Sequence, residues 1–147
     1  MRLPLPPILA ALAMAATWAS RGWLPDLPAP FGFWLGLVAA AAGLALIAPA
    51  ALRFWRAGTT VNPARPEAAR ALVTGGLNAR SRNPMYLGEV LVVLGFGLAV
   101  NPGIGVLAAA GFWLFLDRVQ IPAEERALAA RFGADYDAYR TRVPRWL

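Results

Sequence analysis

A short polar segment carries the side chains of this sequence that are best suited to bind a small charged molecule. Arg80 and Arg82 flank Ser81, and Asn83 and Pro84 follow immediately before a long apolar run. An arginine guanidinium is a planar fork that pairs with a carboxylate, and the first turn of a helix leaves backbone N–H groups without partners. The segment therefore favours a charged, water-soluble cofactor that meets a lipid-borne substrate.

Other residues extend this candidate site. Gly75 and Gly76 allow the backbone to approach a ligand closely, and Tyr86 offers a ring for stacking and a hydroxyl for hydrogen bonding. Glu124 and Glu125 are the only two adjacent carboxylates in the sequence, and they suit an ammonium group or the orientation of a substrate. Together these residue types describe a site for a zwitterionic molecule that carries a ring.

Each of these features also has a purely structural explanation. Arginines beside an apolar span are typical topology signals. A proline that opens such a span is often a helix start, and acidic residues in a first helical turn complement the helix dipole. Residue types alone leave both interpretations open.

The composition indicates an integral membrane protein. The sequence is 59% hydrophobic and 15% charged, whereas soluble domains average roughly 45–50% apolar and about 25% charged residues. It contains no cysteine and no histidine, which excludes disulfides, thiolate metal sites and imidazole catalysis. All 14 basic residues are arginines that lie near apolar spans, so membrane orientation explains them better than nucleic-acid binding does.

The hydropathy pattern predicts an all-α integral membrane protein with one domain and about four transmembrane helices. Residues 31–52 form the clearest span, because about 1.5 Å of rise per residue matches a hydrocarbon core of roughly 30 Å. The first apolar run has the alternative interpretation of a cleaved signal peptide. The predicted spans are residues 3–19, 31–52, 85–100 and 103–119.

Arginine-rich segments predict the orientation of these spans. Residues 53–84 hold six arginines, the chain from Arg118 onward holds another six, and the loops on the opposite side hold only Arg21. The positive-inside rule therefore places both termini and the 53–84 loop in the cytoplasm.

The C-terminal segment, residues 122–147, is expected to be an amphipathic helix that lies on the membrane surface or caps the cytoplasmic loop. Pro122 suits a helix start, Gly133 interrupts the helix and Pro144 ends it. One apolar stripe runs along it at spacings of three or four residues, formed by Leu128, Phe132, Tyr136, Tyr139 and Val143.

Several linked motifs occur in order between Gly58 and Trp146. They are Gly58-Thr-Thr-Val-Asn-Pro63, Leu72-Val-Thr-Gly75, Arg82-Asn-Pro-Met-Tyr-Leu-Gly88, a segment from Glu124 to Tyr139, and Val143-Pro-Arg-Trp146. In sequence and spacing they resemble the isoprenylcysteine carboxyl methyltransferase family, whose wider group includes bacterial phospholipid N-methyltransferases.

The resemblance implies S-adenosylmethionine as the cofactor, bound on the cytosolic side between the loop and the C-terminal segment. The sequence departs from the family at Asn83, where histidine is frequent, and at Asn78, where an aromatic residue is frequent. Arg82 is included among the residues expected to bind the cofactor. The full set is Arg70, Ala71, Leu72, Val73, Asn78, Arg82, Asn83, Pro84, Met85 and Tyr86.

The resemblance also implies residues for the substrate. An arginine and a glutamate four residues later serve the substrate in the eukaryotic carboxyl methyltransferases, and these positions match Gln120 and Glu124. A carboxylate substrate needs only orientation, for which Arg118 lies nearby. An amine substrate needs a base, for which Glu124 or Glu125 is the candidate. Glu124 is the favoured residue, because it lies one helical turn before Leu128 on the apolar face.

The sequence leaves the substrate open between an isoprenylcysteine-type carboxylate and a phospholipid amine. Two other classes also remain: an NADPH-binding membrane protein that resembles sterol reductases, and a non-catalytic membrane scaffold. The expected partners are a lipophilic substrate and the bilayer, without nucleic acid, and the apolar, arginine-rich composition favours a bacterial cytoplasmic membrane. Glycines in the spans permit a homodimer without requiring one.

Overall fold

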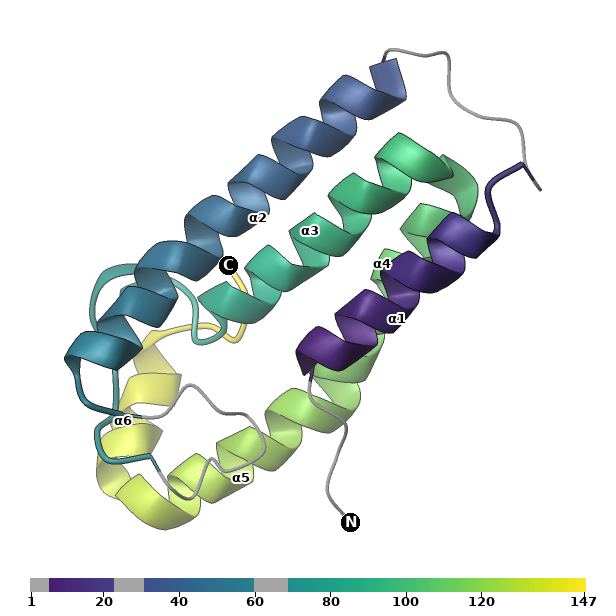
Figure 1. The fold of residues 1–147 in the computed structure, drawn as a ribbon. Helices are drawn as coiled ribbons and strands as arrows, with labels where there is room; N and C mark the ends of the chain where they lie inside the picture. The colour runs from purple at the N-terminus through teal and green to yellow at the C-terminus, as the bar shows by residue number, and fades with distance from the viewer. Residues whose placement is uncertain (1–5, 23–30, 60–68) are drawn as a thin grey trace.

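Alanine- and leucine-rich segments form the long helices of the protein (Figure 1). The computed structural model describes residues 6–22, 31–59 and 69–147, and no strand occurs in these ranges. These ranges contain six α-helices and two short elements. The 3-10 helix η2 (Gly76–Ala79) lies between α2 and α3, and the π-helical turn η3 (Leu116–Gln120) lies between α4 and α5. The α-helices are α1 (Pro6–Ala19), α2 (Phe31–Arg56), α3 (Pro84–Val100), α4 (Pro102–Phe115), α5 (Ile121–Phe132) and α6 (Ala134–Arg142).

The helices have the length and composition of a membrane protein. Two of them, Phe31–Arg56 and the continuous helix Pro102–Phe132, are long and apolar enough to cross a bilayer, and α1 and α3 are shorter apolar helices. Large apolar side chains of α2, including Phe33, Trp34 and Val38, are more than half exposed, as a lipid-facing surface requires. The prediction of an all-α integral membrane protein is confirmed.

Helices α2 and α3 lie side by side because glycines remove the side chains between them (Figure 1). A Cβ atom on Gly36 would lie 2.4 Å from the backbone oxygen of Gly95, and one on Gly43 would lie 2.5 Å from that of Gly88. Small residues are typical of helix contacts in membranes, where association depends on close packing. This contact fixes the two helices that form one wall of the site described below.

The turn between α3 and α4 is held by Asn101, which is fully buried. Its side-chain oxygen accepts a hydrogen bond from the Ile104 N–H (3.3 Å), and its side-chain nitrogen donates to the backbone oxygen of Ser20 (2.9 Å). The first interaction caps α4 and the second ties the end of α1 to this turn. One asparagine therefore connects three helices at this turn.

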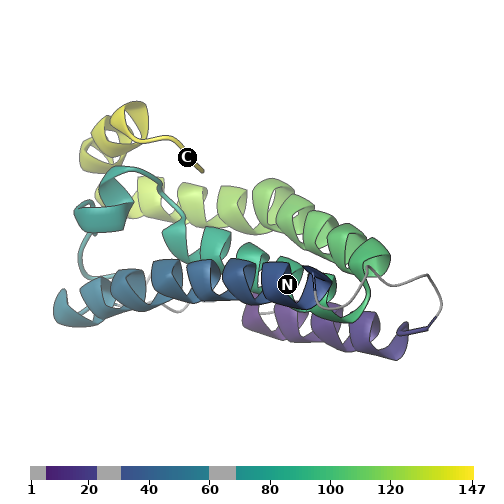
Figure 2. The ribbon, with the colours of Figure 1, turned by 90° about the horizontal axis from the view of Figure 1, so that it is seen from above.

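The sequence predicted a break between a span that ends near Val119 and a new helix that begins at Pro122. The structure instead has one continuous helix through this region (Figure 2). A proline ring normally clashes with the carbonyl four residues earlier. Here the preceding turn is π-helical, with the Ile121 N–H donating to the oxygen of Leu116. The wider turn accommodates Pro122 without ending the helix.

Gly133 separates α5 from α6 with a positive φ of 51°, a conformation that costs glycine little. After this turn α6 packs against the segment before α3 (Figure 2). Tyr136, Tyr139 and Val143 are buried there against Leu72 and Leu128. The residues of the predicted apolar stripe pack together, and they hold α6 against the segment before α3.

The glycine contact gives a first prediction. Gly95→Ala inserts a Cβ that would lie 2.5 Å from the backbone oxygen of Gly36, so we expect a loss of about 1–3 kcal/mol of stability from overpacking. Gly111→Ala in α4 is the matched control, because a Cβ there meets no atom within 4 Å. Thermal unfolding in detergent measures both. Equal midpoints for the two variants would contradict the close approach of α2 and α3.

Candidate active site

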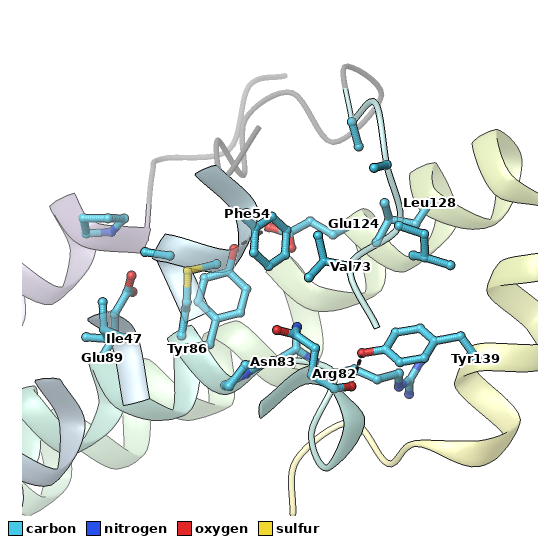
Figure 3. A pocket seen from close by; sticks show the side chains of 18 residues that line it. Ile47, Phe54, Val73, Arg82, Asn83, Tyr86, Glu89, Glu124, Leu128 and Tyr139 are labelled. Carbon is cyan, nitrogen blue, oxygen red and sulfur yellow. Dashed lines mark hydrogen bonds between the residues drawn. The ribbon is translucent and has the colours of Figure 1, made fainter. Parts of the chain in front are cut away.

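A cavity of about 340 Å³ lies where α2, α3, α5 and α6 meet the segment that precedes α3 (Figure 3). Most of its wall is apolar, and a few polar side chains project into it. Cavities of this size and character are the usual binding sites for small molecules. The lining residues are Pro7, Ile47, Ala51, Phe54, Ala69, Ala71, Leu72, Val73, Asn78, Arg82, Asn83, Pro84, Met85, Tyr86, Glu89, Glu124, Leu128 and Tyr139.

The carboxylate of Glu124 stands at the centre of a hydrogen-bonded group that links α3 to α5. Its Oε1 accepts a hydrogen bond from the hydroxyl of Tyr86 and another from Nε2 of Gln120, at 2.6 Å from the nitrogen. Gln120 lies one helical turn before Glu124, so the two side chains share a face of the helix. The group fixes the carboxylate at the cavity wall beside Tyr86.

Glu125 points away from the cavity and has a different set of partners. Its Oε1 lies 3.1 Å from Nη1 of Arg82, and its Oε2 lies 2.7 Å from Nη2 of Arg145. Successive residues of an α-helix differ by about 100° in direction, which explains why two adjacent glutamates have separate environments. Glu125 therefore has a structural role in these ion pairs, and Glu124 is the glutamate of the two that lines the cavity.

Arg82 brings a positive charge to the cavity wall. Its Nη1 donates a hydrogen bond to the Tyr136 hydroxyl (3.3 Å) and pairs with Glu125. Its Nε is buried and has no acceptor among the residues that the structure describes. A buried donor without a partner costs free energy, so Arg82 has an unused N–H to offer to a ligand.

Asn78 supplies an unused acceptor. The residue is 2% exposed, and its side-chain oxygen has no donor within the described ranges. Its backbone oxygen accepts a hydrogen bond from the hydroxyl of Tyr139 (2.7 Å). Burial raises the pKa of Tyr139 to about 12, so this tyrosine remains a neutral donor at physiological pH. The backbone of Asn78 is thereby fixed while its side chain is available to the cavity.

The C-terminal tail holds the arginine loop in place. The backbone oxygen of Arg145 accepts hydrogen bonds from the side chains of Asn83 (3.0 Å) and Ser81 (3.3 Å), and the Arg82 N–H donates to the oxygen of Pro144 (2.9 Å). The Asn83 side chain, expected to serve the cofactor, thus donates to the tail, although the residue also lines the cavity.

The tail is itself anchored to the long helix Pro102–Phe132. Nη1 of Arg145 lies 3.1 Å from Oδ1 of Asp117, and the indole N–H of Trp146 donates to the same oxygen (3.0 Å). The Trp146 ring also packs near Trp113, with 6.1 Å between the ring centroids. The tail therefore fastens the loop to the helix that carries the glutamates.

Of the residues to which the sequence assigned a catalytic, cofactor or substrate role, the cavity brings most together, and four lie outside its wall. Gln120 is buried and reaches the cavity through Glu124, and Glu125 is in the ion pairs above. The Arg118 side chain is 73% exposed and pairs with Asp117. Arg70 is exposed, and its N–H donates to the Thr59 hydroxyl. The predicted residues in the wall are Ala71, Leu72, Val73, Asn78, Arg82, Asn83, Pro84, Met85, Tyr86 and Glu124.

Several residues of the cavity wall were not predicted from the sequence. Glu89 had a visible signal, because it is a single acidic residue within the apolar run of α3. Ile47 and Phe54 of α2 had none, since their contribution depends on how α2 crosses α3. Tyr139 was placed on the apolar stripe, but its contact with Asn78 depends on the turn at Gly133.

The anchored tail gives a second prediction. Arg145→Gln removes the charge that joins Asp117 to Glu125, and we expect it to lower the free energy of unfolding by about 1–3 kcal/mol. It should also make the tail more sensitive to trypsin. Arg140→Gln is the matched control, because Arg140 and its partner Asp137 are both more than half exposed. The anchoring role would be refuted if the two variants resisted heat and protease equally.

Comparison with known proteins identifies the family. The sequence matches the phospholipid methyltransferase family over residues 31–135. A protein of Haemophilus influenzae described as uncharacterized is 35% identical over 63 residues, which are 43% of this chain and the whole of that protein. No solved structure matches the chain. The family match covers the long helix α2 and every lining residue of the cavity except Pro7 and Tyr139, and the chain belongs to the phospholipid methyltransferase family.

Proposed function

We propose that the protein is an S-adenosylmethionine-dependent methyltransferase that acts on a lipophilic substrate within the membrane. Family membership supports methyl transfer at a membrane. The observation that carries the proposal is the cavity, in which polar groups of the loop and apolar groups of α1 and α2 line one space. A water-soluble cofactor and a lipid substrate need such a common space.

The polar wall fits the cofactor. Arg82 has an unused buried N–H for a carboxylate, and Asn78 has an unused buried oxygen for an amine. S-adenosylmethionine presents both groups, and when bound it supplies a methyl group attached to a positively charged sulfur. Val73, Met85 and the ring of Tyr86 provide apolar surface between these polar atoms.

The apolar wall fits a lipid. Pro7 of α1 and Ile47, Ala51 and Phe54 of α2 line the cavity, and they come from helices that expose large apolar side chains. The substrate is thus expected to enter from the bilayer with its reactive group toward Tyr86 and Glu124. An isoprenylcysteine-type carboxylate and a phospholipid amine both meet this description.

The residues at the centre of the cavity would position the substrate and receive its proton. Glu124 is held by Tyr86 and Gln120, so its orientation is fixed before a substrate arrives. An amine must lose a proton to become nucleophilic, and Glu124 is the carboxylate placed to accept it. Fixed orientation of the reacting groups contributes up to about 7–11 kcal/mol of barrier reduction.

We further propose that the loop and both termini face the cytoplasm of a bacterial cell. The arginines of residues 53–84 and of the C-terminal segment support this orientation. The cofactor is a cytosolic metabolite, and the cavity lies beside the same arginine-bearing loop.

A titration with S-adenosylhomocysteine tests the cofactor. We expect the detergent-purified protein to bind it in a calorimeter and Tyr86→Ala to abolish binding, because the ring forms part of the cavity wall. Phe33→Ala is the control, since Phe33 is exposed and does not line the cavity. Binding of NADPH in place of S-adenosylhomocysteine would support the reductase alternative, and binding of neither would support a scaffold.

The two adjacent glutamates give a further prediction. Glu124→Gln should reduce methyl transfer about 10²–10⁴-fold, the usual contribution of a general base, and leave the unfolding temperature nearly unchanged. Glu125→Gln should lower the unfolding temperature, because Arg82 and Arg145 lose their shared partner. Transfer of labelled methyl groups to bacterial total lipid measures the first effect and thermal unfolding the second. Full turnover by Glu124→Gln would exclude its role as the base.

A further inference from the structure

We propose that Glu89 is a substrate-binding residue, whose carboxylate receives the ammonium group of a lipid amine. This inference rests on the proposed function and selects the amine among the substrates considered above. Glu89 lies on α3 and lines the cavity beside Ile47. Arg82 and Tyr139 line the other end of the cavity (Figure 3). Tyr86 lies between these two ends.

The carboxylate of Glu89 lacks the partners that a buried charge requires. Its Oε2 is buried and receives no hydrogen bond from any residue that the structure describes. Acidic residues within membrane helices are costly and are typically retained for function. Tyr86 and Gln120 donate to Glu124, so Glu124 has the donors that Glu89 lacks. The open cavity is the place from which a donor can reach Glu89.

The charge around Glu89 identifies the ligand as a cation. Glu89 and Glu124 both line the cavity, so two carboxylates share one largely apolar space. A carboxylate substrate at this end of the cavity would add a third negative charge in a poorly hydrated site, which is unfavourable. An ammonium group near both carboxylates would be attracted to them and would donate the missing hydrogen bond.

The depth of Glu89 identifies the cation as part of a lipid. Glu89 lies five residues after Pro84, the first residue of α3, which is about 8 Å along the helix axis. With Pro84 at the polar interface, Glu89 lies within the hydrocarbon core of roughly 30 Å, a depth that a membrane-embedded amine reaches more readily than a water-soluble one. An amine in a lipid head group can reach Glu89 through the cavity, whose wall beside this carboxylate is apolar at Ile47.

Binding of a simple lipid amine tests the role of Glu89 without requiring turnover. Dodecylamine and dodecanol share one chain and differ in charge, and calorimetry in matched detergent compares their affinities. We expect the wild-type protein to bind the amine at least about tenfold more tightly than the alcohol, as a charge-assisted hydrogen bond provides. Glu89→Gln should remove this preference and retain the affinity for S-adenosylhomocysteine, which also shows that the variant is folded.

Asp135→Asn is the matched control, because Asp135 is an exposed carboxylate of α6 and does not line the cavity. It should keep the amine preference. An unchanged preference in Glu89→Gln would overturn the inference while leaving the proposed function intact. Selective loss of S-adenosylmethionine over S-adenosylhomocysteine binding in that variant would also overturn it, because Glu89 would then face the sulfonium. If the wild-type protein does not bind S-adenosylhomocysteine, the proposed function itself fails.

Discussion

The ion pair between Arg145 and Glu125 is the interaction on which the cavity most depends. It joins the C-terminal tail to α5, and the backbone of the same arginine accepts hydrogen bonds from the side chains of Ser81 and Asn83. In residues 69–83, the described part of the loop before α3, η2 is the only helical turn. The shape of this loop is therefore maintained by the tail, and the tail is maintained by charges on the long helix Pro102–Phe132.

This arrangement explains why two neighbouring glutamates are needed. Glu125 neutralises Arg82 and Arg145 outside the cavity, and Glu124 is directed into it by the rotation of one residue along the helix. A single carboxylate could not serve both purposes, because a group held between Arg82 and Arg145 cannot also face a substrate in the cavity. The helix thus directs Glu125 to the two arginines and Glu124 to the cavity.

The sequence allowed prediction of features that depend on local pattern. The apolar length of α2, the stripe through Tyr136 and Tyr139, and the side of the helix that carries Glu124 all follow from helical periodicity. The continuity of the helix through Pro122 could not be predicted in this way, because it depends on a π-helical turn that no residue in the sequence marks. Arg118 was expected near the substrate, but its side chain is exposed and pairs with Asp117, because it lies on a different face of the helix.

Features that depend on contacts between distant segments required the structure. The contacts of Arg145 and Trp146 with Asp117 leave no signal in the sequence. Similarly, Glu89 is visible as a charge in an apolar run, but its relation to Glu124 depends on how α3 packs against α5. These are the contacts that convert separate motifs into one site.

The short length of α3 connects the fold to the chemistry. Its 17 residues extend about 26 Å, less than the roughly 30 Å of a hydrocarbon core, whereas the 26 residues of α2 extend about 39 Å. Because the glycine contact holds the two helices together, α2 continues beyond the start of α3 and forms an apolar wall opposite Tyr86. Polar groups at the start of α3 thereby face a surface suited to lipid, so the cavity combines both environments without placing a charge at the centre of the bilayer.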